Sequence, residues 1–203
     1  MSDRTGIKPH SFPTRLNNLF WEITLGISTR GIVDVQHPDS YHYATMSYHT
    51  IRKVLDFLSL QKDDVFVDIG CGKGRVLCLA ARHQLRKVIG VDLSKEFCEI
   101  ARLNAGRMRG RRSPVVVHNS NAVDFNYSEG TAFILFNPFG PTTLNAVLSK
   151  IHRDATGHLV RIAYANPVHD EVFAGHSWLQ PYERWEKEKL DMEHSVYFYR
   201  SNE

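Results

Sequence analysis

Three glycines at alternate positions, Gly70, Gly72 and Gly74, lie in the segment VDIGCGKGR at positions 67–75. The segment follows an apolar run and opens a helical pattern. At such a junction glycine lets the backbone approach a ligand, and helical N–H groups point outward. The dinucleotide fingerprint is GxGxxG, but here the third glycine comes one residue early and Arg75 follows it. The spacing predicts a loop for a ligand without a pyrophosphate; the alternative is a tight turn that binds nothing.

Two further polar positions come after the next apolar runs. Asp92 ends the run VIGVD at 88–92, where a carboxylate can accept both hydroxyls of a ribose. The structural alternative is an aspartate that only caps the following helix. Asn121 ends the next run, and with the Ala122 N–H beside it this side chain can meet the exocyclic amine of an adenine. Taken in order, these positions predict a nucleoside cofactor.

Alternating strands and helices must position these residues. Five short apolar runs predict buried parallel strands, at 65–69, 88–92, 115–118, 132–136 and 159–164. Helical patterns lie before and between them, at 48–58, 74–83, 94–105 (with Ser94 as N-cap) and 141–151 (with Pro141 in the first turn). Two tail segments, WEKEKLDM at 185–192 and SVYFYR at 195–200, predict an antiparallel hairpin at the sheet edge. We therefore expect an α/β fold with a doubly wound, mostly parallel, seven-stranded Rossmann-like sheet that binds ligands at the carboxyl ends of its strands.

The composition of the chain narrows the class of protein. Its 203 residues are 42% hydrophobic and 23% charged, which is typical of one globular domain, here expected over residues 1–203. No apolar run approaches the roughly 18 residues of a membrane span, and the N-terminus lacks the apolar core of a signal peptide. Three cysteines without a CxxC pair favour a reducing cytoplasm, and eleven histidines without ligand spacing predict no metal. The net charge of +3 does not predict nucleic-acid binding. A run of arginines is typical of a solvated face, at positions 102, 107, 109, 111 and 112.

From about residue 43 onward the chain resembles the class I S-adenosylmethionine-dependent methyltransferases. The likeness lies in an ordered set of signals: D-x-G-x-G-x-G, an acidic end to the second strand, N-A after the third and N-P-F after the fourth. It implies that Gly70, Gly72 and Gly74 lie against the methionine and ribose parts of S-adenosyl-L-methionine. Asp92 would hold the ribose, Asn121 the adenine, and Asp68 the methionine amino group.

The segment FNPFG at 136–140 follows the fourth predicted strand. Amino-group methyltransferases carry a D/N-P-P-Y/F signature there, and the resemblance implies catalytic roles for three residues. The Asn137 amide oxygen and the Pro138 carbonyl would accept the substrate N–H groups, and Phe139 would stack on the substrate. The segment departs from this signature because Gly140 follows the aromatic residue and there is only one proline, which places nucleic-acid adenine in doubt as the substrate. The alternative is a loop that only closes the fold.

A second resemblance is to the catalytic domain of the disruptor-of-telomeric-silencing histone-lysine methyltransferases. It is carried by YHYATMSYHT at 41–50, DDVFVDIGCGKGRV at 63–76 and NPFGP at 137–141. The likeness implies that Tyr43, Thr45 and Ser47 help to cover the methionine end of the cofactor, and it raises lysine as a substrate. The long basic extensions of those enzymes are absent from this sequence.

Residues 1–42 lie outside the recognisable fold. Their aromatic residues Phe12, Phe20 and Trp21 predict a packed segment, which we expect to close the substrate side as a lid. After the fifth predicted strand, Tyr164 or His169 is a candidate proton acceptor, with a structural cap as the alternative.

Together these features predict a cytoplasmic methyltransferase that acts on an amine nitrogen, either of a protein lysine or of a small molecule. Methyl transfer to oxygen or carbon of a small molecule is the first alternative. A non-catalytic protein that binds the cofactor or serves as a scaffold is the second. The oligomeric state is not predicted.

Overall fold

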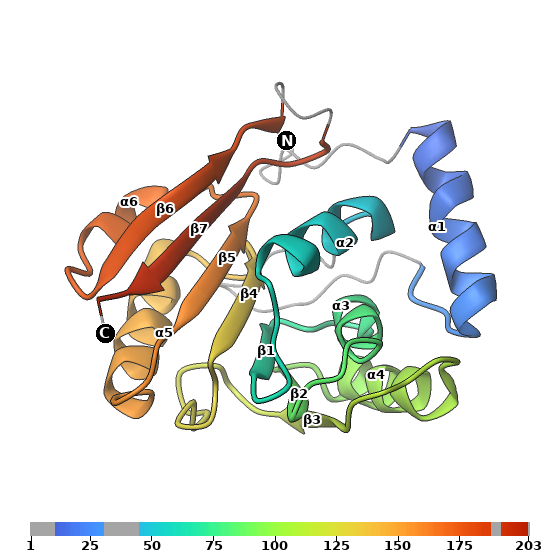
Figure 1. The fold of residues 1–203 in the computed structure, drawn as a ribbon, viewed down its shortest axis with the longest axis horizontal. Helices are drawn as coiled ribbons and strands as arrows, with labels where there is room; N and C mark the ends of the chain where they lie inside the picture. Colours follow the sequence, from blue (N-terminus) through green and yellow to red (C-terminus); the bar gives the residue numbers. More distant parts are fainter. Residues whose placement is uncertain (1–10, 31–44, 188–191, 203) are drawn as a thin grey trace.

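The structure is a computed structural model that describes residues 11–30, 45–187 and 192–202. Its centre is one seven-stranded sheet in the order β3-β2-β1-β4-β5-β7-β6 (Figure 1). The strands are β1 (Val65–Ile69), β2 (Lys87–Asp92), β3 (Val115–Asn119), β4 (Ala132–Phe136), β5 (Arg161–Ala165), β6 (Leu179–Trp185) and β7 (Val196–Ser201). The first five are parallel, whereas β7 is antiparallel to both β5 and β6. The predicted mostly parallel sheet with a terminal hairpin is confirmed.

Helices cover both faces of the sheet. They are α1 (Phe12–Leu25), α2 (Tyr48–Phe57), α3 (Arg75–Ala80), α4 (Lys95–Arg107), α5 (Pro141–Asp154) and α6 (Asp170–Ala174). Side chains of α2, α3 and α4 share one buried cluster with Phe66 of β1, while those of α5 and α6 share the other with Val65 and Val67. Alternate residues of β1 therefore face opposite helical layers, as the period of a strand requires.

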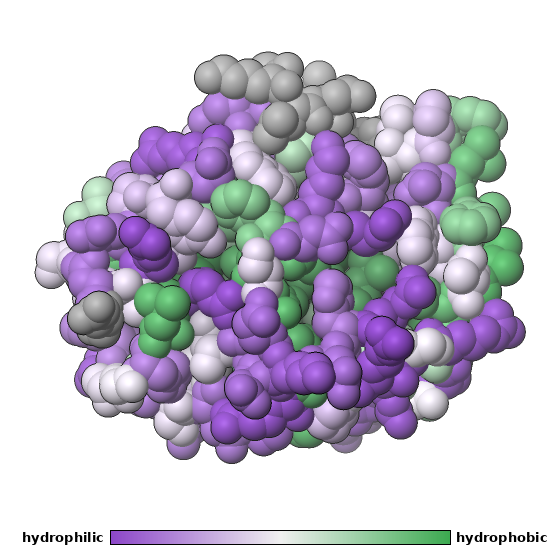
Figure 2. Space-filling view, viewed as in Figure 1, coloured by the Kyte–Doolittle hydropathy of each residue, from purple (hydrophilic) through white to green (hydrophobic). Residues whose placement is uncertain are grey.

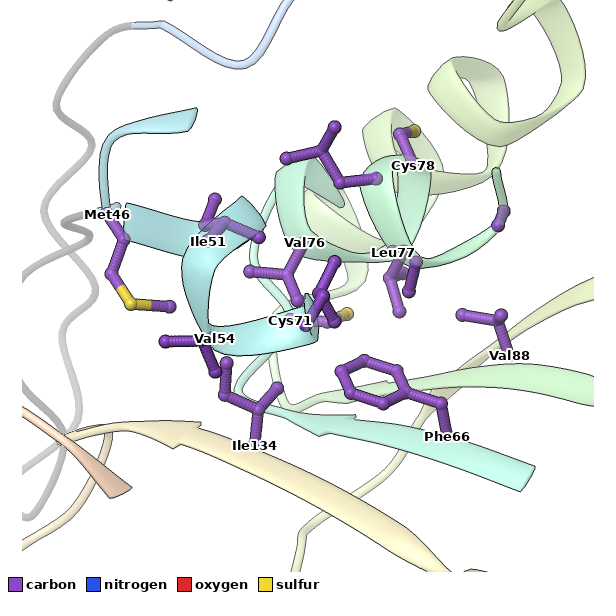
Figure 3. Close-up of a cluster of buried hydrophobic side chains, with 14 of the residues drawn as sticks. Met46, Ile51, Val54, Phe66, Cys71, Val76, Leu77, Cys78, Val88 and Ile134 are labelled. Atoms are coloured by element: carbon purple, nitrogen blue, oxygen red, sulfur yellow. The ribbon is translucent and has the colours of Figure 1, made fainter. Parts of the chain in front are cut away.

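The packing of the first layer places α3 at the end of β1. Val54 of α2 points toward Ile134 of β4, and Leu77 of α3 points toward Phe66 of β1 (Figure 3). Ile51 of α2 belongs to the same buried cluster. All five side chains are fully buried. The glycine loop between β1 and α3 is thus supported by well-packed apolar side chains on the sheet face below it.

Local signals fix where the helices begin. The Ser94 hydroxyl accepts a hydrogen bond from the Phe97 N–H at 3.2 Å, so the predicted N-cap of α4 is confirmed. Ser47 caps α2 in the same way by accepting from the Thr50 N–H at 3.2 Å. Pro141 opens α5, as predicted, at a position where no intrahelical N–H bond is needed. None of the described helices is long and apolar enough to span a membrane.

The tail hairpin differs from the prediction in its first strand. The sequence predicts this strand in WEKEKLDM at 185–192, whereas β6 runs from Leu179 to Trp185. Residues 188–191 lie outside the described part. Most of β6 is exposed, and a register irregularity lies between Pro181 and Glu183. An edge strand needs few apolar residues and tolerates proline, so its sequence resembles a loop.

The N-terminal segment contains helix α1, several of whose apolar side chains are exposed to solvent. Phe12, Leu16, Phe20 and Ile23 are each more than half exposed, and Figure 2 shows the apolar surface over α1. The predictions of one domain over 1–203 and of a lid over 1–42 stay predictions. Residues 1–10 and 31–42 lie outside the described part, and α1 itself packs on α2.

Candidate active site

The glycine loop and the FNPFG loop meet at the switch point of the sheet, where β1 lies between β2 and β4. Gly70, Gly72 and Gly74 have φ of 77°, 50° and 81°, a left-handed backbone that favours glycine. A Cβ atom on Gly70 would lie 2.7 Å from the Pro138 Cβ. Two motifs far apart in the sequence are therefore in direct contact, and only glycine at position 70 permits it.

Asp92 at the end of β2 holds the glycine loop. Its Oδ2 accepts a hydrogen bond from the Gly72 N–H at 2.8 Å, and its Oδ1 accepts from the Ser94 N–H at 2.8 Å. Burial raises the pKa of this carboxyl, and the two N–H donors act against that rise. Each carboxylate oxygen can accept a further bond, so Asp92 is oriented toward the loop and can still receive ribose hydroxyls.

Asp68 at the end of β1 is a buried carboxyl close to Asp92. Among the residues that the structure describes, its Oδ2 has no hydrogen-bond partner. Burial, with the negative charge of Asp92 added, raises the pKa of Asp68 to about 8. A buried carboxylate is costly unless a cation or donor compensates it. S-adenosylmethionine has both an ammonium and a sulfonium group, so Asp68 and Asp92 fit this cofactor.

The predicted adenine contacts lie at the end of β3. The Ser120 N–H donates to the Asp92 carbonyl at 3.0 Å, which keeps this end beside β2. The Asn121 side chain is exposed, and its Oδ1 accepts from the Val123 N–H at 3.3 Å. Ala122 is buried, and its carbonyl accepts from the Tyr127 hydroxyl at 2.8 Å. Both residues thus border the same edge as Asp92, and their contact with adenine stays a prediction.

In the FNPFG loop, Asn137 is buried and held in an unusual backbone conformation. It has φ of 39°, which is uncommon outside glycine and costs of order 1–3 kcal/mol. Its Oδ1 accepts a hydrogen bond from the Tyr164 hydroxyl of β5 at 3.0 Å, and the His169 N–H donates to that hydroxyl at 3.3 Å. The fully buried Tyr164 therefore orients the Asn137 amide. Phe139 is half-buried against the apolar cluster beneath α5.

The second resemblance predicts that three residues before α2 help to cover the methionine end of the cofactor, and the structure describes two of them. Tyr43 lies outside the described residues. Ser47 is buried, and its hydroxyl serves as the cap of α2, while its N–H donates to Glu193 Oε2 at 3.2 Å. The Thr45 hydroxyl donates to the Met46 carbonyl at 3.4 Å. Their contact with the methionine end of the cofactor stays a prediction.

Sequence reasoning missed the residues that connect this site to α1. Arg75, the first residue of α3, donates to the Thr29 hydroxyl at 2.8 Å and to the Met46 carbonyl at 3.0 Å, and it pairs with Glu22 of α1. The Lys73 ammonium donates to the Arg30 carbonyl at 2.9 Å. The sequence signal for these contacts is a basic residue within the glycine loop and another directly after it, and this signal does not indicate which residues they bind.

Comparison with known proteins agrees with this geometry. Residues 66–155 match a family model described as a methyltransferase domain. A protein-lysine N-methyltransferase of Saccharolobus islandicus is 26% identical over 161 residues, which are 77% of this chain and 91% of that protein. Two further relatives match over shorter segments. A ribosomal protein L11 methyltransferase of Paraburkholderia phymatum is 33% identical over 47% of this chain, and a histone-lysine N-methyltransferase of Dictyostelium discoideum, H3 lysine-79 specific, is 30% identical over 40% of it. This chain spans about a third of the former (32%) and 5% of the latter.

Solved structures show the same fold. An RNA methyltransferase from Salinibacter ruber in complex with S-adenosyl-L-homocysteine superimposes with a TM-score of 0.58 at 20% identity, over 78% of this chain and 92% of that one. A methyltransferase from Geobacter sulfurreducens, also in complex with S-adenosyl-L-homocysteine, gives a TM-score of 0.52 at 13% identity, over 76% and 90%. The chain therefore carries a methyltransferase domain and has the fold of solved methyltransferases that bind S-adenosyl-L-homocysteine.

Proposed function

We propose that this enzyme methylates an amine nitrogen, and that the amine is the side chain of a protein lysine. The observation that carries the proposal is the buried Asn137, whose amide the Tyr164 hydroxyl orients at 3.0 Å and whose loop touches the glycine loop through Pro138. The 26% identity to a protein-lysine N-methyltransferase, over most of both chains, supports lysine as the acceptor.

When bound, S-adenosylmethionine supplies an electrophilic methyl group on a positively charged sulfur. Asp68, Asp92 and the glycine loop would hold it at the switch point. Asn137 Oδ1 and the Pro138 carbonyl would accept the N–H groups of the incoming amine and direct its lone pair at the methyl carbon. The new nitrogen–carbon bond forms as the carbon–sulfur bond breaks, and the nitrogen gives up a proton to water.

The energetic demand on the protein is mainly positioning. Holding two reactants in a near-attack geometry can supply about 7–11 kcal/mol. A lysine amine with a pKa of about 10.4 costs about 4–5 kcal/mol to deprotonate at pH 7, and the nearby positive sulfur lowers that cost. A dedicated base is therefore not required, which suits a site where the hydroxyl of Tyr164 is engaged with Asn137.

The experiment that tests this function follows tritiated methyl groups from the cofactor into a cell extract. The labelled extract is separated into protein, nucleic acid and small molecules, and a variant with Asn137→Ala serves as the control. We expect label in the protein fraction, on lysine after acid hydrolysis. Label confined to nucleic acid, or to oxygen or carbon atoms of small molecules, would overturn the proposal. If none of the fractions is labelled, the result favours a non-catalytic role.

A further inference from the structure

Helix α1 carries a row of large apolar side chains on its outer side. Phe12, Leu16, Phe20 and Ile23 follow one another at intervals of three or four residues, so they lie on one side of the helix. Each of them is more than half exposed. The helix lies at the outer edge of the molecule (Figure 1), and apolar surface covers it in Figure 2. These four side chains form an outward-facing apolar row, which we call the α1 ridge.

Polar contacts on the inner side of α1 hold the ridge outward. The Asn18 Oδ1 atom accepts a hydrogen bond from the Tyr48 N–H of α2 at 3.1 Å, and the buried Glu22 pairs with Arg75 of α3. A rotation of α1 that turned the ridge inward would break both contacts. It would also leave the charges of Glu22 and Arg75 without each other, which is costly for a buried pair. The exposed apolar row is therefore a fixed feature of the fold.

Positive charge surrounds the α1 ridge. Arg15 lies on α1 itself, and the Arg109 guanidinium donates to the backbone carbonyl of the last ridge residue at 2.9 Å. Arg52 and Arg82 lie over the Trp21 ring of α1, at 4.9 and 5.5 Å from its centroid. All four arginines are exposed. The acidic residue of α1 is the buried Glu22, which is already paired. The surroundings of the ridge therefore favour an anionic partner.

An anionic lipid surface fits this combination better than other partners do. A second copy of the same face would bring like charges together, and a stable protein interface uses about 20–30 residues on each side, whereas the ridge has four. A nucleic acid is anionic, but Leu16 and Ile23 offer its bases neither a stacking ring nor a hydrogen bond. Lipid accepts both parts, since acyl chains take up apolar side chains and head-group phosphates pair with arginines.

We propose that α1 is a membrane-docking helix, which lies along an anionic lipid surface with its ridge between the head groups and the acyl chains. The surrounding arginines then contact the phosphates of the head groups. Because Glu22 and Arg75 tie α1 to α3, docking through the ridge brings the whole enzyme to the membrane. The proposal is independent of the methyl acceptor, since the ridge contains none of the predicted cofactor or acceptor residues.

The test is co-sedimentation of the full chain with two kinds of vesicle. One contains phosphatidylcholine and phosphatidylglycerol in equal parts, and the other contains phosphatidylcholine alone. We expect at least tenfold stronger binding to the anionic vesicles, and added salt should weaken it because ions screen exposed charges. A variant with both Phe20→Ser and Ile23→Ser should bind the anionic vesicles at least tenfold more weakly, which corresponds to about 1.4 kcal/mol. Leu159→Ser, at a 49% exposed leucine between α5 and β5, is the matched control and should bind like the wild type.

A charge reversal tests the arginines separately from the ridge. Arg15→Glu should weaken binding to the anionic vesicles, whereas Lys62→Glu, the same charge change at an exposed position before β1, should have little effect. Equal binding of the wild type to both kinds of vesicle, or unchanged binding of the double variant, would overturn the proposal. Failure of the wild type to bind the anionic vesicles would also overturn it. A wild-type dimer in sedimentation velocity that the double variant loses would then assign the ridge to a second copy.

Discussion

Glu22 of α1 and Arg75 of α3 form a buried ion pair, with Oε1 and Nη2 3.3 Å apart and side chains 2% and 3% exposed. Arg75 directly follows Gly74, the last glycine of the glycine loop. The same Glu22 oxygen also accepts from the Thr29 N–H at 3.0 Å and the Thr29 hydroxyl at 2.7 Å. The pair therefore ties α1 to the helix that begins at the glycine loop.

Replacing Glu22 with Ala should destabilise the protein strongly. Breaking a buried pair leaves an uncompensated charge on Arg75, which costs about 3–5 kcal/mol. Urea unfolding measures the free energy of unfolding, and Glu99→Ala on the exposed face of α4 is the control, expected within about 0.5 kcal/mol of the wild type. A loss no greater for Glu22→Ala than for Glu99→Ala would show that α1 is only loosely attached.

The raised pKa of Asp68 predicts a pH dependence of stability in the absence of cofactor. The folded protein holds a proton on Asp68 up to about pH 8, whereas the unfolded chain releases it near its ordinary pKa of 3.8. Between those values the folded state binds more protons, so this group makes the free energy of unfolding fall as the pH rises. Asp68→Asn should remove that part of the slope.

The measurement is urea unfolding at several pH values between about 5 and 8. Asp63→Asn, an exposed aspartate just before β1, is the matched control and should keep the slope of the wild type. An identical slope in Asp68→Asn and the wild type would contradict a protonated, buried Asp68.

Asp92→Ala should weaken cofactor binding at least tenfold. The carboxylate is held by the Gly72 and Ser94 N–H groups, and hydrogen bonds to a charged group contribute about 1.5–3 kcal/mol each. Isothermal calorimetry with S-adenosylmethionine and S-adenosylhomocysteine tests this, with Asp63→Ala as the control at the opposite end of β1. Unchanged affinity in Asp92→Ala would exclude the ribose role, and tight binding of NAD would contradict S-adenosylmethionine as the cofactor.

Much of the fold could be predicted because the central strands carry their own signal. The runs at 65–69 and 132–136 are buried on both faces, so their apolar character gives the bounds of β1 and β4 directly. The sequence of α1 gives no such signal, because several of its apolar side chains are exposed and polar side chains take buried positions. Its buried positions include the polar residues Asn18 and Glu22, while Phe12 and Phe20 face outward.

The site could be predicted only as far as its motifs are local in sequence. A short stretch of sequence is enough to recognise each motif: the glycine loop, Asp92 at the end of a strand, and FNPFG. The contacts that orient them join distant residues: Tyr164 lies 27 positions from Asn137, and Glu193 lies 146 from Ser47. The sequence offers Tyr164 as a candidate proton acceptor, and the structure shows its hydroxyl donating to the Asn137 amide oxygen at 3.0 Å. A role of Tyr164 as a base stays a prediction.

Asn137→Ala should separate chemistry from binding. The Asn137 oxygen would accept an N–H bond that strengthens as the acceptor nitrogen gains charge, so its loss should cost about 10²–10³ in kcat. Cofactor affinity should barely change. Tyr164→Phe removes only the hydroxyl that orients the amide and should cost about 3- to 10-fold, the size of one neutral hydrogen bond. Full turnover in Asn137→Ala would show that the FNPFG loop is structural.

The most direct test of amine methylation is mass spectrometry of a single-lysine peptide incubated with the enzyme and cofactor carrying a deuterated methyl group. Fragment ions locate the label, and a parallel reaction contains RNA in place of the peptide. We predict label on the lysine side-chain nitrogen with the wild-type enzyme and on no atom of the RNA. Labelled RNA, or label on oxygen or carbon with an unlabelled lysine, would contradict the account.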